Sequence, residues 1–563
     1  MKSAAALPCL SKAASTWQLH VDGKPYLILG GQVQNSSLSS AEHMKPIWKR
    51  LVDMGINTVL GPVSWEDIEP TEGAFEFKEL DAILDGARSH GLRLVLLWFG
   101  SFKNGMSTYA PSWVKKDAQR FPRAQVQAAH GSLKTVEVLS VFSQQCVDAD
   151  AKAFATFMRH LKAVDQQRTV IMVQVENESG LLTDTRDRSH TAETTFRAPP
   201  DKQLLNFLER QWSTLDASFT SMFQQFWAYK DTSTSLDWEG YFGKSQWTDE
   251  LFMAYHYARY LNQVAAAGKA EYSLPLFINV WLPKPESLSP VEGLAAGGHR
   301  PGIYPSGGAT SSVLNIWEEF APSIDFISPD IYSADYTDTC DIYGMRDQAL
   351  FIPEQRRDAF GARRMSQAIG TYGAIGVCPF AIDTLTGNVP FAPLYKLLQP
   401  LSTIILAAQA RPNASFGFYF DEYDSNKPGQ EKIYKKCFGN YKLTITRAFV
   451  LGQPGPGTGL ILETGPSKFV LVGMGFKVQF QSLSTSSHFT GILTYKEKRV
   501  SDAEKGVLET VRSLNGDETK SGAWCNMPND NPDYGDQYIP MTCPAGTMIS
   551  EVEVYSLERA RAS

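Results

Sequence analysis

The sequence lacks most of the features that mark secreted, membrane-spanning or metal-binding proteins. Its seven cysteines are odd in number and scattered, so they form neither a disulfide framework nor the paired spacing of a zinc site. Its nine histidines make no His-x-His pair and no His-Glu-x-x-His helix, and we expect no catalytic metal and no cofactor. No stretch reaches the roughly 20 apolar residues that a membrane helix needs.

Strong charge of one sign is also absent. The net charge is −7, and no run of Lys and Arg could follow a phosphate backbone, which excludes nucleic acid as an expected partner. Residues 1–10 contain one basic residue and a weak apolar run broken by Pro8, which falls short of a secretory signal. This pattern favours a cytoplasmic location, with secretion left open. The oligomeric state is not encoded in any motif that we can read.

What the chain does have is a globular composition and room for more than one structural unit. Hydrophobic residues make up 43% and charged residues 20% of its 563 residues, values typical of proteins with large buried cores. A barrel with insertions can exceed about 400 residues and leave a smaller unit behind it.

Short apolar runs alternate with longer amphipathic ones over the first 400 residues or so, after a hairpin signal at residues 21–24. We predict eight strands at 26–30, 57–60, 92–99, 170–175, 276–280, 324–328, 349–353 and 374–377. Eight repeated βα units predict an α/β fold of the (β/α)8 TIM barrel class, followed by a smaller β-rich C-terminal domain. The predicted domains are residues 1–411, a catalytic barrel with an N-terminal hairpin and a large insertion after strand four, and residues 412–563, a β-rich accessory domain.

Helical patterns separate these strands. One apolar stripe with helical spacing is formed by Leu80, Ile83, Leu84 and Ala87, and it ends before Gly91. Residues 154–161 show the same spacing. Ser39 and Glu42 have the spacing of a capping box for the first helix. An apolar pattern over 394–408, restarted at Pro400, predicts the last helix of the barrel. In the insertion we expect an irregular stretch at 181–200 and then two long helices.

Two acidic residues follow predicted strands of the barrel. An apolar run over 170–175 leads to Asn177 and Glu178, and the run over 350–353 ends at Glu354. Catalytic groups of a TIM barrel lie at the C-terminal ends of its strands, so these acids are expected to face each other across the mouth. The structural alternatives are a helix cap for Glu178 and a salt bridge from Glu354 to Arg356 or Arg357.

A pair of carboxyl groups is what glycoside cleavage requires. One protonates the leaving oxygen, while the other attacks the anomeric carbon or activates water, and a separation near ~5.5 Å predicts retention of configuration. A raised pKa would keep the acid protonated near neutral pH. Asn177, beside Glu178, is well placed to bind a substrate hydroxyl.

These motifs resemble the β-galactosidases of glycoside hydrolase family 35. The segment 174–180 resembles that family's acid/base motif, while 65–70 and 110–114 resemble signatures shared with family 42. The segments 97–105 and 351–354 resemble a divergent family 35 branch that carries a β-rich C-terminal domain. The resemblance implies that Glu178 is the acid/base and Glu354 the nucleophile of a retaining mechanism.

The sequence departs from the family pattern in two places. Gly30 to Asn35 replaces a Gly-Glu-x-His-Tyr segment after strand one, and no Glu-Tyr follows the nucleophile. Both changes touch the glycone pocket, so galactose is less firmly implied than glycoside hydrolysis. Beside Asn177, the residues expected to contact sugar are Asn35, Glu66, Trp98, Asp330 and Tyr332.

The expected function is an exo-acting retaining β-galactosidase that removes terminal β-D-galactosyl residues from oligosaccharides or plant polysaccharide side chains. Its partner is thus a carbohydrate substrate. Two alternatives stay open: a β-glycosidase or transglycosylase for another sugar, such as a glucoside or an arabinopyranoside, and a carbohydrate-binding barrel without catalysis.

Overall fold

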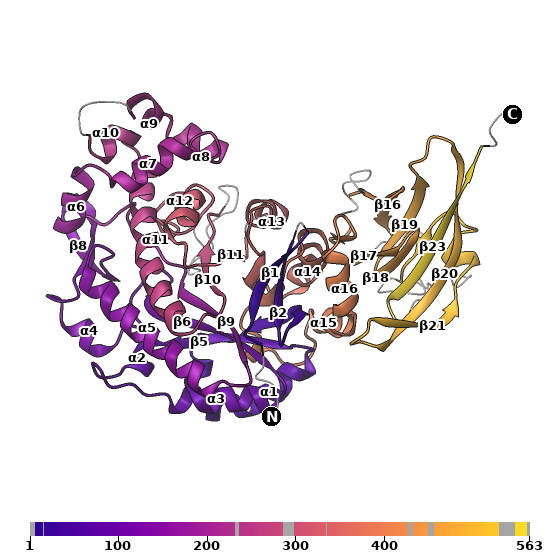
Figure 1. Cartoon of the computed structure of the whole chain (residues 1–563), viewed down its shortest axis with the longest axis horizontal. Helices are drawn as coiled ribbons and strands as arrows, with labels where there is room; N and C mark the ends of the chain where they lie inside the picture. Colours follow the sequence, from indigo (N-terminus) through magenta and orange to yellow (C-terminus); the bar gives the residue numbers. More distant parts are fainter. Residues whose placement is uncertain are drawn as a thin grey trace.

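The core of the molecule is a closed barrel of parallel strands, which confirms the predicted fold class. The structure is a computed structural model that describes residues 6–14, 16–230, 236–284, 298–333, 335–424, 426, 432–448, 455–528 and 546–559. The barrel closes in the order β10-β11-β12-β13-β4-β5-β6-β9 (Figure 1). In chain order its strands are β4 (Ile28–Gln32), β5 (Thr58–Ser64), β6 (Arg93–Lys103), β9 (Val170–Asn177), β10 (Leu276–Trp281), β11 (Phe326–Ile331), β12 (Phe351–Gln355) and β13 (Gly376–Pro379).

Each of the eight predicted runs overlaps one of these strands, so their number and order are confirmed. Side chains alternate between the two faces of each strand because the strand period is two. In β6, Val95, Leu97 and Phe99 belong to an apolar cluster with members from all eight strands, which is the barrel interior. Leu94, Leu96 and Trp98 belong instead to the large cluster between barrel and helices.

An antiparallel sheet of β1 (Cys9–Ala13), β2 (Thr16–Val21) and β3 (Lys24–Tyr26) precedes the barrel. Val21 pairs with Lys24, and Asp22 and Gly23 have φ values of 53° and 76°. Two positive φ values are what a two-residue hairpin turn needs, and the predicted hairpin is confirmed. Leu19 and Val21 add apolar side chains to the cluster of the barrel interior.

Helices surround the barrel, and the predicted apolar stripes at 80–87 and 154–161 are buried in two of these helices. They include α1 (Ala41–Asp53), α2 (Trp65–Ile68), α3 (Lys78–Ser89), α4 (Ser112–Lys116), α5 (Gln144–Val164), α12 (Leu314–Phe320), α13 (Tyr336–Gly344) and α14 (Ala359–Tyr372). The predicted cap at Ser39 is wrong. The cap of α1 is Ser40, whose side chain accepts a hydrogen bond from the His43 N–H, because Ser39 already lies in a 3-10 turn (Ser37–Ser39).

The predicted restart at Pro400 is confirmed, since α15 (Ala392–Leu398) and α16 (Ser402–Gln409) are joined there by a 3-10 turn. Between β6 and α5 lies a small hairpin of β7 (Arg123–Gln127) and β8 (Leu133–Leu139).

The insertion after β9 is more helical than predicted. The stretch 181–200, expected to be irregular, contains a helix with a buried apolar side and a serine cap. The described helices of the insertion are α6 (His190–Arg197), α7 (Lys202–Gln211), α8 (Ala217–Met222), α9 (Gln224–Tyr229), α10 (Trp238–Phe242) and α11 (Gln246–Glu271). Only α11 is long, and it packs along α5 beside the barrel (Figure 1).

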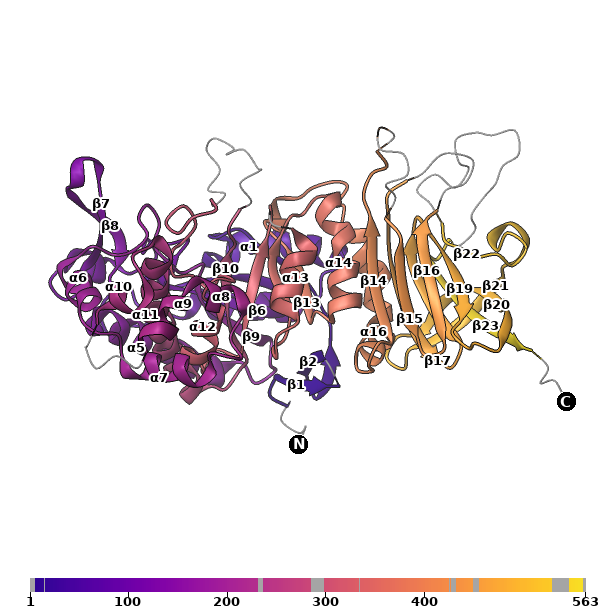
Figure 2. The ribbon, with the colours of Figure 1, turned by 90° about the horizontal axis from the view of Figure 1, so that it is seen from above.

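A β-rich region follows the barrel, as predicted, and forms the other end of the elongated molecule (Figure 2). Among the described residues it has a six-stranded sheet, β14-β17-β18-β23-β20-β21, and a four-stranded sheet, β15-β16-β19-β22. The strands are β14 (Ser415–Phe420), β15 (Tyr434–Phe438), β16 (Tyr441–Arg447), β17 (Gly457–Gly465), β18 (Lys468–Met474), β19 (Phe476–Ser482), β20 (Ser487–Asp502), β21 (Val507–Ser513), β22 (Cys525–Asn526) and β23 (Ile549–Glu558).

This region packs directly on the barrel through α14. Thr371 Oγ1 donates to the Gly417 carbonyl over 2.6 Å, and Arg364 pairs with Asp421 at 2.8 Å. A Cβ on Gly417 would lie 1.7 Å from the Ser366 carbonyl, so only glycine permits this close approach of strand and helix. No helix among the described residues is long and apolar enough to cross a membrane.

Candidate active site

Three strands bring three carboxyl groups to the C-terminal mouth of the barrel. Glu178 follows β9, Asp330 lies near the end of β11, and Glu354 lies near the end of β12. Asp330 and Glu354 are paired in the parallel register of β11 and β12. The sequence predicted that Glu178 and Glu354 lie at the same face, and in the barrel order two strands, β10 and β11, separate β9 from β12.

Neutral donors hold the carboxylate of Glu354. Gln32 Nε2 donates to Oε2 over 2.9 Å, and the Tyr332 hydroxyl donates to Oε1 over 2.6 Å. The salt bridges considered from the sequence do not form, since Arg356 pairs with Asp358, and Arg357 donates to the Ala381 carbonyl over 2.5 Å. These two donors occupy one oxygen each of the Glu354 carboxyl group and fix its orientation.

Glu178 is in a different environment. It is only 8% exposed, and its N–H donates to Asn279 Oδ1 over 2.9 Å. Burial first, and the charge of Glu354 second, raise the pKa of Glu178 to about 7, while Lys103 and a hydrogen bond with Asp330 act in the opposite direction. Glu178 thus tends to keep its proton near neutral pH.

The backbone around Glu178 is strained. Glu176 and Glu178 have φ values of 61° and 45°, a region that non-glycine residues rarely adopt. Gly180 has φ 148°, and a Cβ there would lie 2.6 Å from Pro305. Leu181 also exchanges backbone hydrogen bonds with Ser306 at 2.9 and 2.8 Å. The loop before α12 therefore fixes the turn that presents Glu178.

Lys103 is a buried cation beside the acids that sequence reasoning missed. It ends β6, is 8% exposed, and its Nζ donates to Asn177 Oδ1 over 2.8 Å. The segment 97–105 was quoted for its family resemblance, but no signal in it showed that the ammonium group turns toward Asn177. Asn279, which contacts both Glu178 and Asp330, was missed for the same reason.

Several polar atoms at the barrel mouth have no hydrogen-bond partner among the described residues. They are Asn35 Oδ1, Asn177 Nδ2, Ser179 Oγ and Asp330 Oδ1. Buried polar atoms are nearly always paired, so a concentration of unpaired ones marks a place where a polar ligand supplies the partners. Asn35 and Asn177 were both predicted as sugar contacts.

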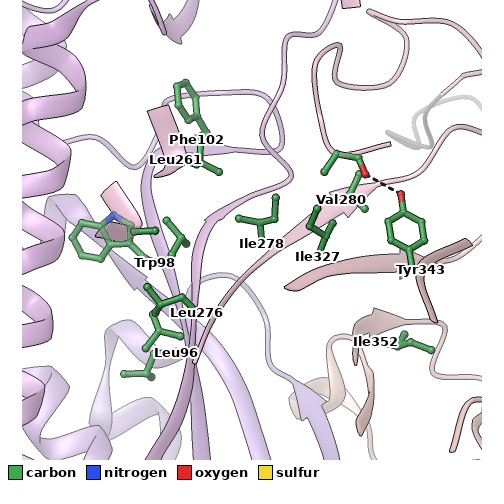
Figure 3. Close-up of a cluster of buried hydrophobic side chains, with 14 of the residues drawn as sticks. Leu96, Trp98, Phe102, Leu261, Leu276, Ile278, Val280, Ile327, Tyr343 and Ile352 are labelled. Atoms are coloured by element: carbon green, nitrogen blue, oxygen red, sulfur yellow. Dashed lines mark hydrogen bonds between the residues drawn. The ribbon is translucent and has the colours of Figure 1, made fainter. Parts of the chain in front are cut away.

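The prediction for Trp98 is wrong. Its indole is fully buried in the apolar cluster between barrel and helices (Figure 3). The ring stacks on Phe157 with a centroid distance of 5.4 Å, and its N–H donates to Asp150 over 3.0 Å. Trp98 alternates with Leu97 and Phe99, which point into the barrel, so strand geometry directs it outward. Trp281, at the end of β10, has the inward parity of Phe277, is partly exposed, and pairs in register with Asp330.

Of the remaining predicted sugar contacts, Tyr332 lies at the site and Glu66 does not contact it. Tyr332 reaches the site through its hydrogen bond to Glu354. Glu66 lies on α2 and pairs with Lys115 at 3.1 Å, and none of the described contacts joins it to Glu178 or Glu354. No group of three or more His, Cys, Asp or Glu side chains among the described residues has the arrangement of a metal site.

Comparisons with known proteins agree with the expectation of a glycoside hydrolase and change the family. Residues 36–234 match the family model of glycoside hydrolase family 42, described as beta-galactosidase. Residues 391–526 match a domain of unknown function, DUF5597. A beta-galactosidase of Xanthomonas manihotis is 26% identical over 223 residues, which are 36% of this chain and 33% of that relative. The match thus spans about a third of the relative's length.

Two of the solved structures that are similar to this chain illustrate the degree of likeness. The beta-galactosidase from Bacillus circulans sp. alkalophilus is 15% identical, with 68% of this chain and 57% of that chain covered and a TM-score of 0.45. The catalytic domain of beta-amylase from Paenibacillus polymyxa is 13% identical, with 68% and 99% covered and a TM-score of 0.46.

The resemblance to family 35 drawn from the sequence is therefore wrong. The segments 65–70 and 110–114 are shared by both families, and the strand-one segment that would have distinguished family 35 is missing from this chain. The family model that residues 36–234 match is that of glycoside hydrolase family 42, described as beta-galactosidase.

Proposed function

We propose that this chain is a retaining exo-β-galactosidase that removes terminal β-D-galactosyl residues from oligosaccharides or plant polysaccharide side chains. Glu178 is the general acid/base and Glu354 the nucleophile. The observation that carries the proposal is the pair of carboxyl groups at one barrel mouth: burial raises the pKa of Glu178 to about 7, while Gln32 and Tyr332 orient Glu354 through hydrogen bonds. The match to the family 42 model supports the substrate class.

The two groups divide the reaction between them. Glu354 attacks the anomeric carbon while Glu178 gives its proton to the leaving oxygen, and a glycosyl ester of Glu354 results. That ester carries no charge, so one cause of the raised pKa of Glu178 disappears. Glu178 then ionises readily and takes a proton from the water that hydrolyses the ester. The same residue thus serves as acid and then as base.

The sugar contacts follow from the unpaired atoms and from the mouth of the barrel. Asn35 Oδ1 and Asn177 Nδ2 lack hydrogen-bond partners among the described residues, and sugar hydroxyls can provide them. Trp281 offers a partly exposed ring at the same face, where an apolar sugar face can stack. Because the helical insertion follows β9 and Glu178 directly, we expect it to narrow the approach to the site, which would favour chain ends over internal bonds.

The test is a panel of aryl β-glycosides that differ only in the sugar, assayed with wild-type protein and with Glu354→Ala as the blank. Preference for the galactoside supports the proposal. Preference for another sugar would change the proposed substrate and would point to the altered segment 30–35 as the source of the specificity. Binding without turnover would instead support a carbohydrate-binding role. Proton NMR of the first anomer released checks retention, since an inverted product contradicts a covalent ester on Glu354.

A further inference from the structure

Asp330 is the third carboxyl group of the site, and its surroundings differ from those of a sugar contact. It is 4% exposed on β11, with the inward parity of Phe326 and in register with Glu354. Asn279 Nδ2 donates to its Oδ2 over 2.6 Å. The same amide accepts the Glu178 N–H through its Oδ1, which fixes the orientation of the Asn279 side chain.

The other oxygen of Asp330 has no donor. Its Oδ1 is buried and finds no hydrogen-bond partner among the described residues, although the carboxyl group lies within hydrogen-bonding reach of Glu178. Two ionised carboxylates are both acceptors and cannot bond to each other. A proton on Asp330 Oδ1 would satisfy that atom and join the two groups.

The charges around Asp330 favour this proton. Burial, and then the charges of Glu354 and Glu178, raise the pKa of Asp330 well above its usual range. The charge of Lys103 acts in the opposite direction, but its ammonium group is hydrogen-bonded to Asn177 and Asn104. Tyr332, which also faces the cluster, is itself a donor to Glu354.

We propose that Asp330 is a neutral carboxylic acid that donates a hydrogen bond to Glu178 and so positions and tunes the acid/base residue. This inference rests on the proposed glycosidase function. Asp330 is a positioning residue, because it acts on the substrate only through Glu178. A buried carboxylic acid kept neutral so that it can donate a hydrogen bond is a known device of enzyme active sites.

The role in the cycle is to stabilise the ionised form of Glu178. When Glu178 gives its proton to the leaving oxygen, its new carboxylate accepts the Asp330 O–H. When water attacks the ester, Glu178 takes one proton from that water, and the hydroxide portion becomes the new anomeric hydroxyl. Asp330 keeps its own proton throughout, so no additional proton donor or acceptor is needed.

Asparagine reproduces a neutral aspartic acid in this geometry. In Asp330→Asn the amide oxygen can accept from Asn279, and the amide N–H can donate to Glu178. Asp330→Ala removes the donor altogether. The alkaline limb of kcat/KM against pH, which follows deprotonation of the acid, is therefore expected to stay in place in Asp330→Asn and to move upward by about 1 pH unit in Asp330→Ala.

An ionised Asp330 predicts the opposite sign, because removing a neighbouring anion lowers the pKa of Glu178 in both variants. A limb that moves to lower pH in either variant, or that moves equally in both, overturns the proposal. A sugar-contact role predicts instead a rise in KM without any movement of the limb, and this too overturns it. Circular dichroism and thermal melting of each variant check that the fold is intact.

Infrared spectroscopy tests the protonation state without turnover. In the wild-type minus Asp330→Asn difference spectrum at pH 7, a neutral Asp330 gives a protonated-carboxyl stretching band, and an ionised one gives a carboxylate band. If no glycoside is cleaved, the proposed function fails, but this spectrum still decides the state of Asp330. A carboxylate band overturns the inference even where hydrolysis is observed.

Discussion

The Tyr332 hydroxyl donates a hydrogen bond to Oε1 of Glu354 over 2.6 Å. Tyr332 directly follows β11, the strand that neighbours β12, on which Glu354 lies. This bond and the one from Gln32 occupy one oxygen each of the proposed nucleophile. The carboxylate is thus oriented by two uncharged groups, which leave its negative charge available for attack.

Removing the tyrosine hydroxyl should weaken the nucleophile. A hydrogen bond to a charged group contributes about 1.5–3 kcal/mol, so Tyr332→Phe is expected to lower kcat/KM by roughly 10- to 100-fold. Tyr336→Phe is a matched control, because the Tyr336 hydroxyl donates to Gln355, next to Glu354 in the chain. Equal losses in the two variants would contradict a specific role for Tyr332.

Replacing the acid/base should have effects that depend on the leaving group. Glu178→Ala is expected to slow substrates with poor leaving groups far more than activated aryl glycosides, since the latter need little protonation. Initial rates on a series of aryl galactosides with different phenol pKa values measure this dependence. A uniform loss across the series would remove Glu178 from the acid role.

Lys103 offers a test of the electrostatics. Its positive charge lowers the pKa of Glu178, so Lys103→Met should raise that pKa above about 7 and move the alkaline limb of kcat/KM to higher pH. Lys115→Met, which removes an ammonium group paired with Glu66 instead, should leave the limb in place. A shift toward lower pH in Lys103→Met would refute the assigned sign.

Substitutions of the tryptophans on β6 and β10, Trp98 and Trp281, should have different effects on melting temperature and KM. Trp98→Phe removes the N–H that Asp150 accepts, and is expected to lower the melting temperature with little change in KM. Trp281→Ala should raise KM with a smaller effect on melting. The reverse pattern would restore Trp98 as the sugar contact and exclude Trp281.

A buried acid away from the site should make stability depend on pH. Glu250 accepts from the Tyr304 hydroxyl at 2.7 Å and from Ser312 at 2.9 Å, and burial raises its pKa to about 7. Because this pKa is higher in the folded state, its contribution is complete below the unfolded value near 4.5 and is lost as pH rises through 7.

The loss amounts to on the order of 3 kcal/mol. Melting temperatures of wild-type protein and Glu250→Gln at pH 5 and pH 8 measure it. The wild type should lose stability between these values, and the variant should lose much less. Parallel curves would show that Glu250 is not the titrating group.

The strands and the positions of both proposed catalytic acids could be predicted because each depends on local pattern. An apolar run that ends in an acid shows in the sequence wherever it occurs, as at Glu178 and Glu354. Trp98 was mispredicted because its direction depends on the parity of a strand whose inward face was not identified. Treating every polar or aromatic residue near a strand end as inward ignores this alternation.

Contacts between strands were beyond prediction for a different reason. The pairing of Asp330 with Glu354, and the bonds of Asn279 to two acids, depend on the stagger of neighbouring strands in the closed barrel. Lys103 is the last residue of a strand of 11 residues, longer than the predicted run, so its side chain reaches Asn177 from a position that the pattern did not include.

The close approach of Gly417 to α14, the helix after β12, packs the C-terminal β-rich region against the barrel. Leu460, Leu462, Val470 and Ile549 of the C-terminal sheet belong to the same apolar cluster as the helix layer of the barrel. A chain shortened before this sheet would expose part of that cluster to water. Heat should therefore melt barrel and sheet in one cooperative transition. A destabilising substitution in the sheet, far from the proposed active site, would then lower activity by lowering the fraction of folded protein.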